Sequence, residues 1–516
     1  MKSVDRHPFE PDVRFDGGNL DCGNGLLLMI RKAIDPLDRG RLLEIRSTES
    51  SVEEDLPSWC RMTGNELVSW TRTGAQRSFL VCKGAVRERS KAPRVASGQK
   101  DVPSQLVVPV RIPDTLPEPA RVPGISPFSV TGIGSWPRPS WMLRAVHEHL
   151  EGRSSEAEFQ AAADDAVRLA VDAQLRAGVD IVTDGEQRRD SYASFVGGLL
   201  DNCQLIPLTD LFPLVEDPAK FEKELRALDV PAGEVRHPAV FGPLGRSRPL
   251  AVHELEFVRT VSDKPVKVAL PGPYLLTRTM WLECVSDRAY DSRESLAEDI
   301  VRVLREELHF LLAAGASLVQ FDEPVLTEVV FTGAKKTRSF MCGALSEKKD
   351  APFELAFARD LLNRVVQGVP ASRTAVHICR GNWTTEESVA LSGDYRPLLP
   401  YLKSARVGTF FLELCTPRAG EIEVLKGLPE ECRVGVGVVN QKSKRIESVE
   451  EIVAKAEKAI RVFGPGRILL NPDCGFATFA DNPLAEGKVA EGKLRSISLA
   501  AEVLKTRYLR KTRKGP

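Results

Sequence analysis

Three short apolar segments place metal-binding side chains where buried strands are expected to end. One segment supplies an imidazole and a thiol, another a carboxylate, and the third a second thiol. Together they make up a tetrahedral set of nitrogen, oxygen and sulfur ligands of the kind that zinc prefers. The sequence therefore predicts chemistry centred on a metal-bound thiolate. The four residues are His377, Cys379, Glu413 and Cys474.

The spacing of these residues supports a shared site. His377 and Cys379 are two apart in an extended apolar run, and the period of two in a strand puts both on one face. The alternative is a core pair, because free cysteine is among the most buried residue types. Glu413 weakens that alternative, since a carboxylate in a buried run must be paired, metal-bound or neutral. Cys415 is an alternative ligand, because it follows Glu413 by two residues.

Composition excludes several classes of protein. The 516 residues contain 71 Lys plus Arg and 71 Asp plus Glu, so no overall charge favours binding to nucleic acid or to an acidic membrane. No apolar stretch approaches the roughly 20 residues that span a bilayer, and the polar start lacks the apolar core of a signal peptide. The cytoplasm is the expected location. Ten scattered cysteines indicate thiols, ligands or catalysts rather than a disulfide framework.

The chain divides into three parts by composition. Residues 1–87 are expected to form a small α+β unit, and residues 88–124 are rich in proline and indicate an extended linker. Residues 125–516 hold the predicted metal ligands, so this part is expected to be catalytic.

The third part repeats one pattern, in which an amphipathic helix, a glycine, a short apolar run and a polar cluster follow one another. For example, apolar residues at helical spacing over 300–312 precede Gly315 and the apolar run 318–321. Eight alternating units predict a (β/α)₈ barrel, an α/β fold whose active site lies where the strands end. A helix-rich multidomain protein is the alternative. The expected strands end near Gly134, Val182, Leu270, Phe321, Cys379, Leu414, Val439 and Leu470.

Six segments of this part resemble the catalytic barrel of cobalamin-independent methionine synthase, over roughly residues 126–505. The resemblance implies that Zn²⁺ is bound by His377, Cys379, Glu413 and Cys474, and it favours Glu413 over Cys415. It also implies that Ser135, Glu186 and Asp322 hold the amino-acid part of homocysteine. The six segments are 132–137, 184–186, 321–324, 377–379, Glu413 and 471–475.

The function implied is a zinc-dependent methyltransferase that moves a methyl group to homocysteine and gives methionine. The activity would be similar to that of 5-methyltetrahydropteroyltriglutamate–homocysteine methyltransferase, with Asp322, Glu186 and Lys442 as catalytic residues. Zinc would keep the substrate sulfur as a thiolate at neutral pH, and Glu413 is the ligand expected to yield to it. Lys442 stands where the full-length folate-dependent enzymes carry a histidine. The chain therefore resembles the single-barrel members, and the donor is expected to be a methyl-corrinoid protein or methyltetrahydrofolate.

Each of the acidic and basic site residues also has a purely structural interpretation. Asp322 could cap the helix that follows it, and Glu186 could pair with Arg188 or Arg189. Lys442 is either a surface lysine or a residue that steers an anionic group of the donor or substrate.

The N-terminal unit resembles the TusA-like sulfur-carrier family over residues 12–85, and Cys22 matches that family's persulfide-carrying cysteine. The family's Cys-Pro-x-Pro is Cys-Gly-Asn-Gly here. A position just before a helix over 26–33 would favour the thiolate of Cys22. The alternative is an ordinary buried or exposed thiol. The remaining cysteines are expected to be structural, namely Cys60, Cys82, Cys203, Cys284, Cys342 and Cys432.

Two further functions stay open at this point. In the first, the chain is a sulfur-relay protein that receives persulfide on Cys22 from a sulfur donor protein. In the second, the zinc-activated site transfers an alkyl group to another small thiol. Retained contacts to an amino acid from Ser135, Glu186 and Asp322 favour methyl transfer to homocysteine over the second alternative.

Overall fold

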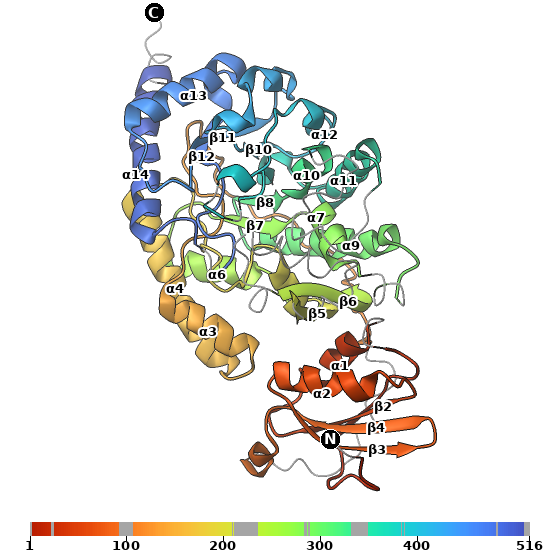
Figure 1. Ribbon diagram of the computed structural model, residues 1–516. Helices are drawn as coiled ribbons and strands as arrows, with labels where there is room; N and C mark the ends of the chain where they lie inside the picture. The colour runs from red at the N-terminus through yellow and green to blue at the C-terminus, as the bar shows by residue number, and fades with distance from the viewer. Residues whose placement is uncertain are drawn as a thin grey trace, which may run out of the picture.

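The chain forms a small N-terminal unit and a larger α/β unit that follows it (Figure 1). Cys22, Cys284 and Cys342 lie outside the residues that the computed structural model describes. The described residues are 3–21, 25–91, 107–208, 210, 236–282, 286, 289–331, 349–382, 384–385, 387–480 and 483–509.

The N-terminal unit is a four-stranded mixed sheet with two helices on one face (Figure 1). The strands pair in the order β1-β2-β4-β3, and only β1 and β2 are parallel. Apolar residues of both helices, such as Ile30 and Leu56, pack on the sheet in a core of their own. The elements are β1 (Val13–Asp16), α1 (Leu26–Ile34), β2 (Leu42–Ser47), α2 (Val52–Met62), β3 (Glu66–Thr73) and β4 (Gln76–Cys82).

The larger unit is built on a six-stranded parallel sheet. Its strands are β7 (Lys267–Pro271), β8 (Leu318–Asp322), β9 (Thr374–Ile378), β10 (Thr409–Leu412), β11 (Arg433–Val439) and β12 (Ile468–Pro472), hydrogen-bonded in this order. The helices are α3 (Ser140–Leu150), α4 (Glu156–Ala177), α6 (Val252–Val261), α7 (Pro273–Met280), α9 (Arg293–Ala313), α10 (Val325–Phe331), α11 (Ala351–Val365), α12 (Leu399–Leu402), α13 (Val449–Phe463) and α14 (Gly487–Leu504).

The two edge strands of this sheet are connected through two short segments. Val130 forms a parallel bridge with Leu470 of β12, Thr131 with Ile181, and Val182 with Val266 beside β7. Six of the eight expected strands are therefore observed as strands, whereas the two expected near Gly134 and Val182 are single bridges. Glycines with positive φ enclose the second segment at positions 178 and 185, so the chain is extended there for only a few residues.

Side chains of successive strand residues alternate between the two faces of the sheet. The face covered by helices contributes to the main core, for example through Val319 and Val376. The opposite face, called the inner face below, has a smaller apolar cluster. Asp322 and His377 follow members of that cluster at even spacing, so they project from the inner face as well. The cluster contains Ile133, Leu318, Ala375, Phe411 and Leu469.

Strand β11 has glycine at two inner-face positions because neighbouring side chains fill the space. A Cβ atom at Gly435 would collide with the ring of Phe411, and one at Gly437 with the Oδ1 atom of Asp473. That same Oδ1 atom accepts hydrogen bonds from the backbone N–H groups of Leu414 and Cys415, at 2.9 and 2.8 Å.

Replacing Gly437 by alanine is therefore expected to destabilise the fold by about 1–3 kcal/mol, since a crowded interior must shift to admit the methyl group. The measurement is the urea denaturation midpoint. The matched control is Gly466→Ala, where a Cβ atom meets nothing within 4 Å. An equal midpoint for the two variants would contradict the crowding argument.

An antiparallel pair of strands, β5 (Asp201–Pro207) and β6 (Arg236–Gly245), was not expected from the sequence. It lies between the parallel sheet and helix α1 of the N-terminal unit (Figure 1). Arg31 of α1 forms an ion pair with Asp210 at 2.6 Å, and the Nε2 atom of Gln204 donates to Asp35 at 2.8 Å. Leu28 also enters the main core. The N-terminal unit is thus docked through α1.

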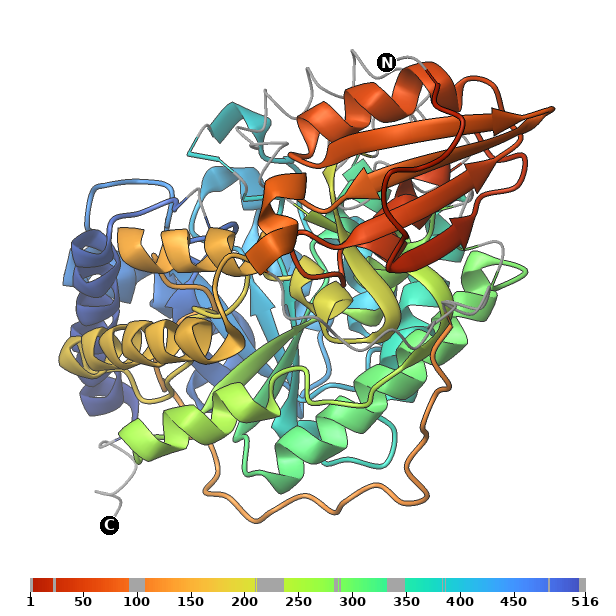
Figure 2. The same ribbon diagram turned by 90° about the horizontal axis from the view of Figure 1, so that it is seen from below.

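The described part of the expected linker, residues 107–124, is extended and attached to the larger unit (Figure 2). Val108 and Asn202 exchange two hydrogen bonds, of 2.6 and 3.0 Å. Further along, the N–H group of Ala120 donates to the carbonyl of Leu312 at 3.0 Å. Residues 92–106 lie outside the described residues.

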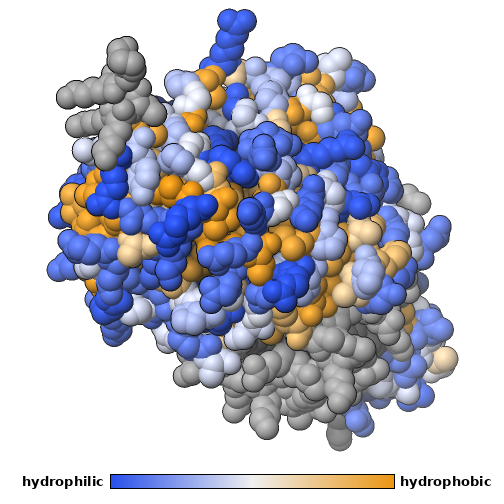
Figure 3. Space-filling view, turned by 90° about the horizontal axis from the view of Figure 1, so that it is seen from above, coloured by the Kyte–Doolittle hydropathy of each residue, from blue (hydrophilic) through white to orange (hydrophobic). Residues whose placement is uncertain are grey.

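On the face shown in Figure 3, hydrophobic patches are interrupted by hydrophilic residues. Across the described ranges, no helix combines the length and the apolar character needed to cross a membrane.

Candidate metal centre and active site

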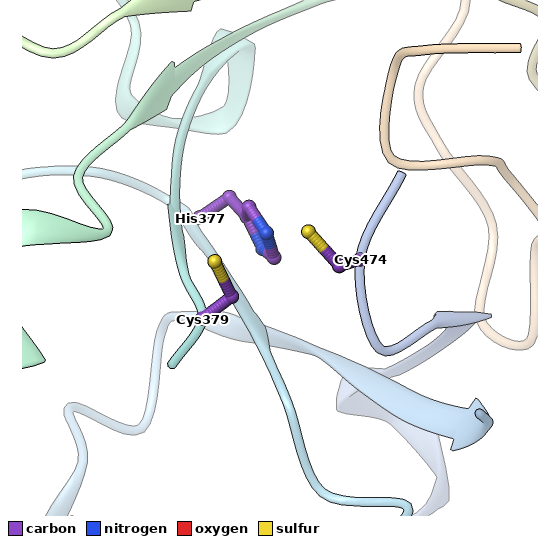
Figure 4. A group of neighbouring side chains, drawn as sticks. All are labelled: His377, Cys379 and Cys474. Carbon is purple, nitrogen blue, oxygen red and sulfur yellow. The ribbon is translucent and has the colours of Figure 1, made fainter. Parts of the chain in front are cut away.

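Three of the four predicted ligands meet on the inner face, where the strands end. His377 lies in β9, Cys379 directly follows it, and Cys474 follows β12. One ligand atom from each of them lies within 4.8 Å of the others, and all three side chains are buried. Figure 4 shows them pointing toward one another. The pairing of β9 with β8 and β10 fixes this position, since Asp322 and Phe411 are the register partners of His377.

The imidazole of His377 is oriented for ligation. Its Nδ1 atom lies 3.2 Å from the carbonyl oxygen of Phe411, and because that oxygen can only accept, Nδ1 carries the hydrogen. The Nε2 atom is buried and finds no hydrogen-bond partner among the described residues. Metal-binding histidines typically donate the hydrogen of the other ring nitrogen to such an acceptor, which fixes the tautomer.

The two thiols interact directly. A hydrogen bond from the Cys474 thiol holds the pKa of Cys379 well below its usual range, although burial opposes this, and the same bond raises the pKa of Cys474. The shared proton therefore favours the thiolate form of Cys379 and the thiol form of Cys474. A dication would replace that shared proton, because thiolates rather than thiols bind metals. The orphaned imidazole nitrogen and the two thiols fit a zinc site.

Glu413, the fourth predicted ligand, is fully buried but is not part of this group. Its carboxylate accepts hydrogen bonds from the backbone N–H of Arg380 and from Nδ2 of Asn382, both at 2.9 Å, and from Nε of Arg418 at 2.8 Å. Burial raises the pKa of Glu413, and Arg380 opposes that rise. These three donors are called the carboxylate cradle below.

Cys415, the alternative ligand, is also separate from the group. Its sulfur atom accepts a hydrogen bond from the Lys455 ammonium at 2.8 Å, and burial raises the pKa of its thiol to about 12. The cysteines at 60, 82, 203 and 432 are free thiols elsewhere in the fold.

A pocket of about 410 Å³, including its open mouth, lies over the three ligands. The three residues predicted to hold the substrate, Ser135, Glu186 and Asp322, line this pocket as well. The structure therefore brings together the predicted substrate residues and three predicted metal ligands. The complete lining is Ile133, Ser135, Glu186, Tyr192, Asp322, Pro324, His377, Cys379, Asn382, Cys474, Gly475 and Thr478.

The two pocket carboxylates are destabilised as anions by their surroundings. Burial raises the pKa of Glu186 to about 8, although Arg189 at 3.9 Å opposes the rise. Glu186 adopts a φ of 56°, which a non-glycine residue rarely does. Burial also raises the pKa of Asp322 to about 6. A cation in the pocket would stabilise the ionised forms of both carboxylates.

The structural interpretations of these residues have different outcomes. Glu186 does pair with Arg189, whereas Arg188 binds Gln160 and Asp164 instead. Asp322 accepts a hydrogen bond from the Nε2 atom of Gln320 at 2.7 Å rather than capping a helix. Its neighbour Glu323 caps a different helix, α7, which comes earlier in the chain, by accepting hydrogen bonds from the N–H groups of Tyr274 and Leu275.

Lys442 is not a surface lysine, so that interpretation was wrong. The residue is only 5% exposed. Burial lowers the pKa of Lys442 to about 8, and the acidic groups of Glu413, Cys474 and Cys379 oppose the lowering. Lys442 therefore lies near the ligands without lining the pocket itself.

Several residues that support the site were not predicted from the sequence. Asn382 and Arg418 form part of the carboxylate cradle, while Tyr192 and Thr478 line the pocket. Asp473 was quoted only as part of a motif, yet its hydrogen bonds hold the backbone that follows Glu413. Its position beside Cys474 was the only available signal.

Most of the larger unit matches a known protein family. The family described as "Cobalamin-independent synthase, Catalytic domain" matches residues 128–207 and 230–491. The methionine synthase of Saccharolobus solfataricus is 27% identical over 382 residues, which are 74% of this chain and 96% of that protein. The methionine synthase of Sulfurisphaera tokodaii is 29% identical over 346 residues, or 67% of this chain and 85% of that protein.

Solved structures show the same fold. A B12-independent methionine synthase from Shewanella sp. W3-18-1, in complex with selenomethionine, superposes with a TM-score of 0.56 at 23% identity. The match covers 75% of this chain and all of that one. A putative enzyme of the same type from Listeria monocytogenes gives a TM-score of 0.52 at 18% identity, over 74% and 98% of the two chains.

The family match begins at residue 128, so it gives no support to a TusA-like identity for the N-terminal unit. It covers well over half of the chain and includes every predicted metal ligand and pocket residue. The chain therefore belongs to the family of the cobalamin-independent synthase catalytic domain, and it is a methyltransferase of the methionine synthase type.

Proposed function

We propose that the chain transfers a methyl group to the thiol of homocysteine and gives methionine, at a zinc ion bound by His377, Cys379, Cys474 and Glu413. The main support is the buried group of one imidazole and two thiols beneath a pocket with two carboxylates. The names of the relatives, which are methionine synthases, point to the same reaction.

The fold that presents this site is proposed to be a closed (β/α)₈ barrel. The segments around Val130 and Ile181 would act as its first two strands, because their bridges join β12 to β7. Closure would place the ends of all eight strands around one pocket, as in other barrel enzymes.

Zinc, when bound, would lower the pKa of the substrate thiol so that it reacts as a thiolate at neutral pH. The pocket residues would orient the rest of homocysteine. Glu186 and Asp322 would accept hydrogen bonds from its ammonium group, since the Arg189 guanidinium stays 3.9 Å from Glu186 and the hydrogen bond that Asp322 accepts comes from the neutral amide of Gln320. The Ser135 hydroxyl, which accepts from the N–H of Ala477 at 3.3 Å, could turn its own hydrogen toward the substrate.

Glu413 would complete the ligand set and yield to the incoming sulfur. Its three cradle donors would then stabilise the released carboxylate, because each can donate to it without rearrangement of the backbone. Lys442 would add positive charge beside this anionic centre.

A methyltetrahydrofolate is the proposed methyl donor, in keeping with the methionine synthase relatives. A methyl-corrinoid donor and a sulfur donor protein gain no support from the comparisons. The sulfur-relay function also gains none, and Cys22 lies outside the described residues. Alkyl transfer to a different small thiol is less favoured, since two carboxylates suit a substrate with an amino group.

The test is the zinc content and the zinc-edge X-ray absorption spectrum of the purified full chain, with and without homocysteine. About one zinc per chain is expected, and homocysteine should add a sulfur ligand. Homoserine, which has a hydroxyl in place of the thiol, is the matched control and should leave the sulfur count unchanged. Absence of zinc, or a spectrum indifferent to homocysteine, would overturn the proposal.

A further inference from the structure

Lys267 is a buried cation on the inner face, beneath the pocket. It is the first residue of β7 and is 1% exposed. Its Nζ atom donates to the carbonyl of Gly132 at 2.6 Å and to Oε1 of Gln320 at 2.7 Å, and it lies 4.3 Å from the centre of the Phe411 ring. These contacts offset part of the cost of burying a charge.

Gln320 lies between this cation and the pocket. It is fully buried in β8, two residues before Asp322. Its Nε2 atom donates to Oδ1 of Asp322 at 2.7 Å and to the carbonyl of Ile133 at 3.1 Å. An amide has one accepting and one donating end, whereas an ammonium group only donates. The ammonium group of Lys267 therefore requires the amide oxygen of Gln320 to face it, and this leaves the NH₂ group of Gln320 to face Asp322.

The same two side chains hold a second wall of the pocket. The carbonyls that they bind belong to Gly132 and Ile133, directly before Gly134 and Ser135. A Cβ atom at Gly134 would collide with the Glu186 carboxylate, so this segment packs tightly on Glu186. Ser135 lines the pocket itself. One buried network thus contacts Asp322 directly and also the segment that positions Ser135 and Glu186.

We propose that Lys267 and Gln320 are positioning residues, which orient Asp322 and the 132–135 segment to bind the ammonium group of the amino-acid substrate. This inference rests on the proposed function. Arg189, another buried cation near the pocket, has a carboxylate partner in Glu254. Lys267 instead binds a carbonyl and an amide, so its hydrogen bonds reach Asp322 through Gln320. Burial lowers the pKa of Lys267 to about 7, while Asp322 and Glu186 oppose the lowering.

The test compares two ligands that differ only in the amino group, homocysteine and 4-mercaptobutyrate. Their dissociation constants are measured by calorimetry on the zinc-loaded full chain. In Lys267→Met, homocysteine is expected to bind about 10-fold more weakly, as for loss of one charged hydrogen bond. Binding of 4-mercaptobutyrate and the zinc content should stay unchanged. Lys267→Arg should recover part of the loss.

Gln320→Glu provides a second variant if Lys267→Met fails to fold. It keeps the size of the side chain but places a carboxylate against Asp322, so the same selective loss is expected. Lys493→Met is the matched control, because Lys493 is a fully buried lysine that pairs with Glu447 away from the pocket. It should lower stability without changing the preference for homocysteine.

Two results would overturn the inference. One is an equal loss for both thiols in the Lys267 and Gln320 variants, and the other is an undiminished preference for homocysteine. Failure of the unaltered chain to bind homocysteine at all would instead remove the proposed function, and this inference with it.

Discussion

The Cys474→Ser protein is expected to lose its zinc and at least about 100-fold of its methyl-transfer rate. This loss exceeds the one expected when a residue that only hydrogen-bonds to a metal ligand is removed. Serine keeps the shape of the side chain, but its hydroxyl does not ionise at neutral pH and is a poor zinc ligand. Removal of Cys474 would also leave the Cys379 thiolate without its hydrogen-bond donor. Metal analysis after dialysis and the rate of methionine formation are the two measurements.

The matched control is Cys415→Ser. Cys415 is a partly buried thiol near Glu413, yet its sulfur binds Lys455 and not the ligand group. Zinc content and activity should therefore stay near those of the unaltered chain. Retention of zinc by Cys474→Ser together with its loss from Cys415→Ser would reverse the ligand assignment.

The position of His377 and Cys379 could be predicted from sequence because it depends on local rules. A strand presents every second residue on one face, and the ends of parallel strands meet at one edge of the sheet. Six expected strands are observed, and β8, β9 and β12 deliver Asp322, His377 and Cys474 to one pocket. Periodicity and strand order are enough for that result.

The surroundings of Glu413 could not be predicted, because they depend on how the loops pack around its carboxylate. Asn382 lies in the connection between β9 and β10, and Arg418 in the connection between β10 and β11. No sequence pattern in either connection predicts that these two residues contact the carboxylate. A surface position was one of the two alternatives for Lys442, because lysine usually lies there, but the fold buries this residue. Sequence rules describe single elements well and loop packing poorly.

The antiparallel pair β5 and β6 shows the same limit. Its strands are joined across a long stretch of sequence, so their pairing has no local turn signal. The pair nevertheless positions the N-terminal unit. Gln204 of β5 donates a hydrogen bond to the carbonyl of Arg31 in helix α1, and the Arg31 side chain pairs with Asp210 just beyond β5. A unit held in this way differs from the freely tethered carrier that a flexible linker would suggest.

Asp322→Asn and Glu186→Gln are each expected to raise the KM for homocysteine by about 10- to 100-fold, since a charged hydrogen bond contributes about 1.5–3 kcal/mol. The zinc content should not change, because neither side chain belongs to the ligand group. The turnover number should fall less than kcat/KM, since the reacting sulfur is held by the metal centre and not by these carboxylates.

The pH dependence of KM independently tests whether the ionised forms of the same carboxylates bind the substrate. Burial raises the pKa of Glu186 to about 8 and of Asp322 to about 6, so the fraction of both that is ionised grows as the pH rises. An ammonium group binds the ionised forms, and KM should therefore fall from pH 6 to pH 8 in the unaltered chain. Glu186→Gln should flatten the upper part of this fall. The control is Glu306→Gln, because Glu306 is a buried acid that pairs with Arg302 outside the pocket. This variant should keep the full fall in KM with pH. An identical flattening in Glu306→Gln would show that the carboxylates act on stability rather than on the substrate.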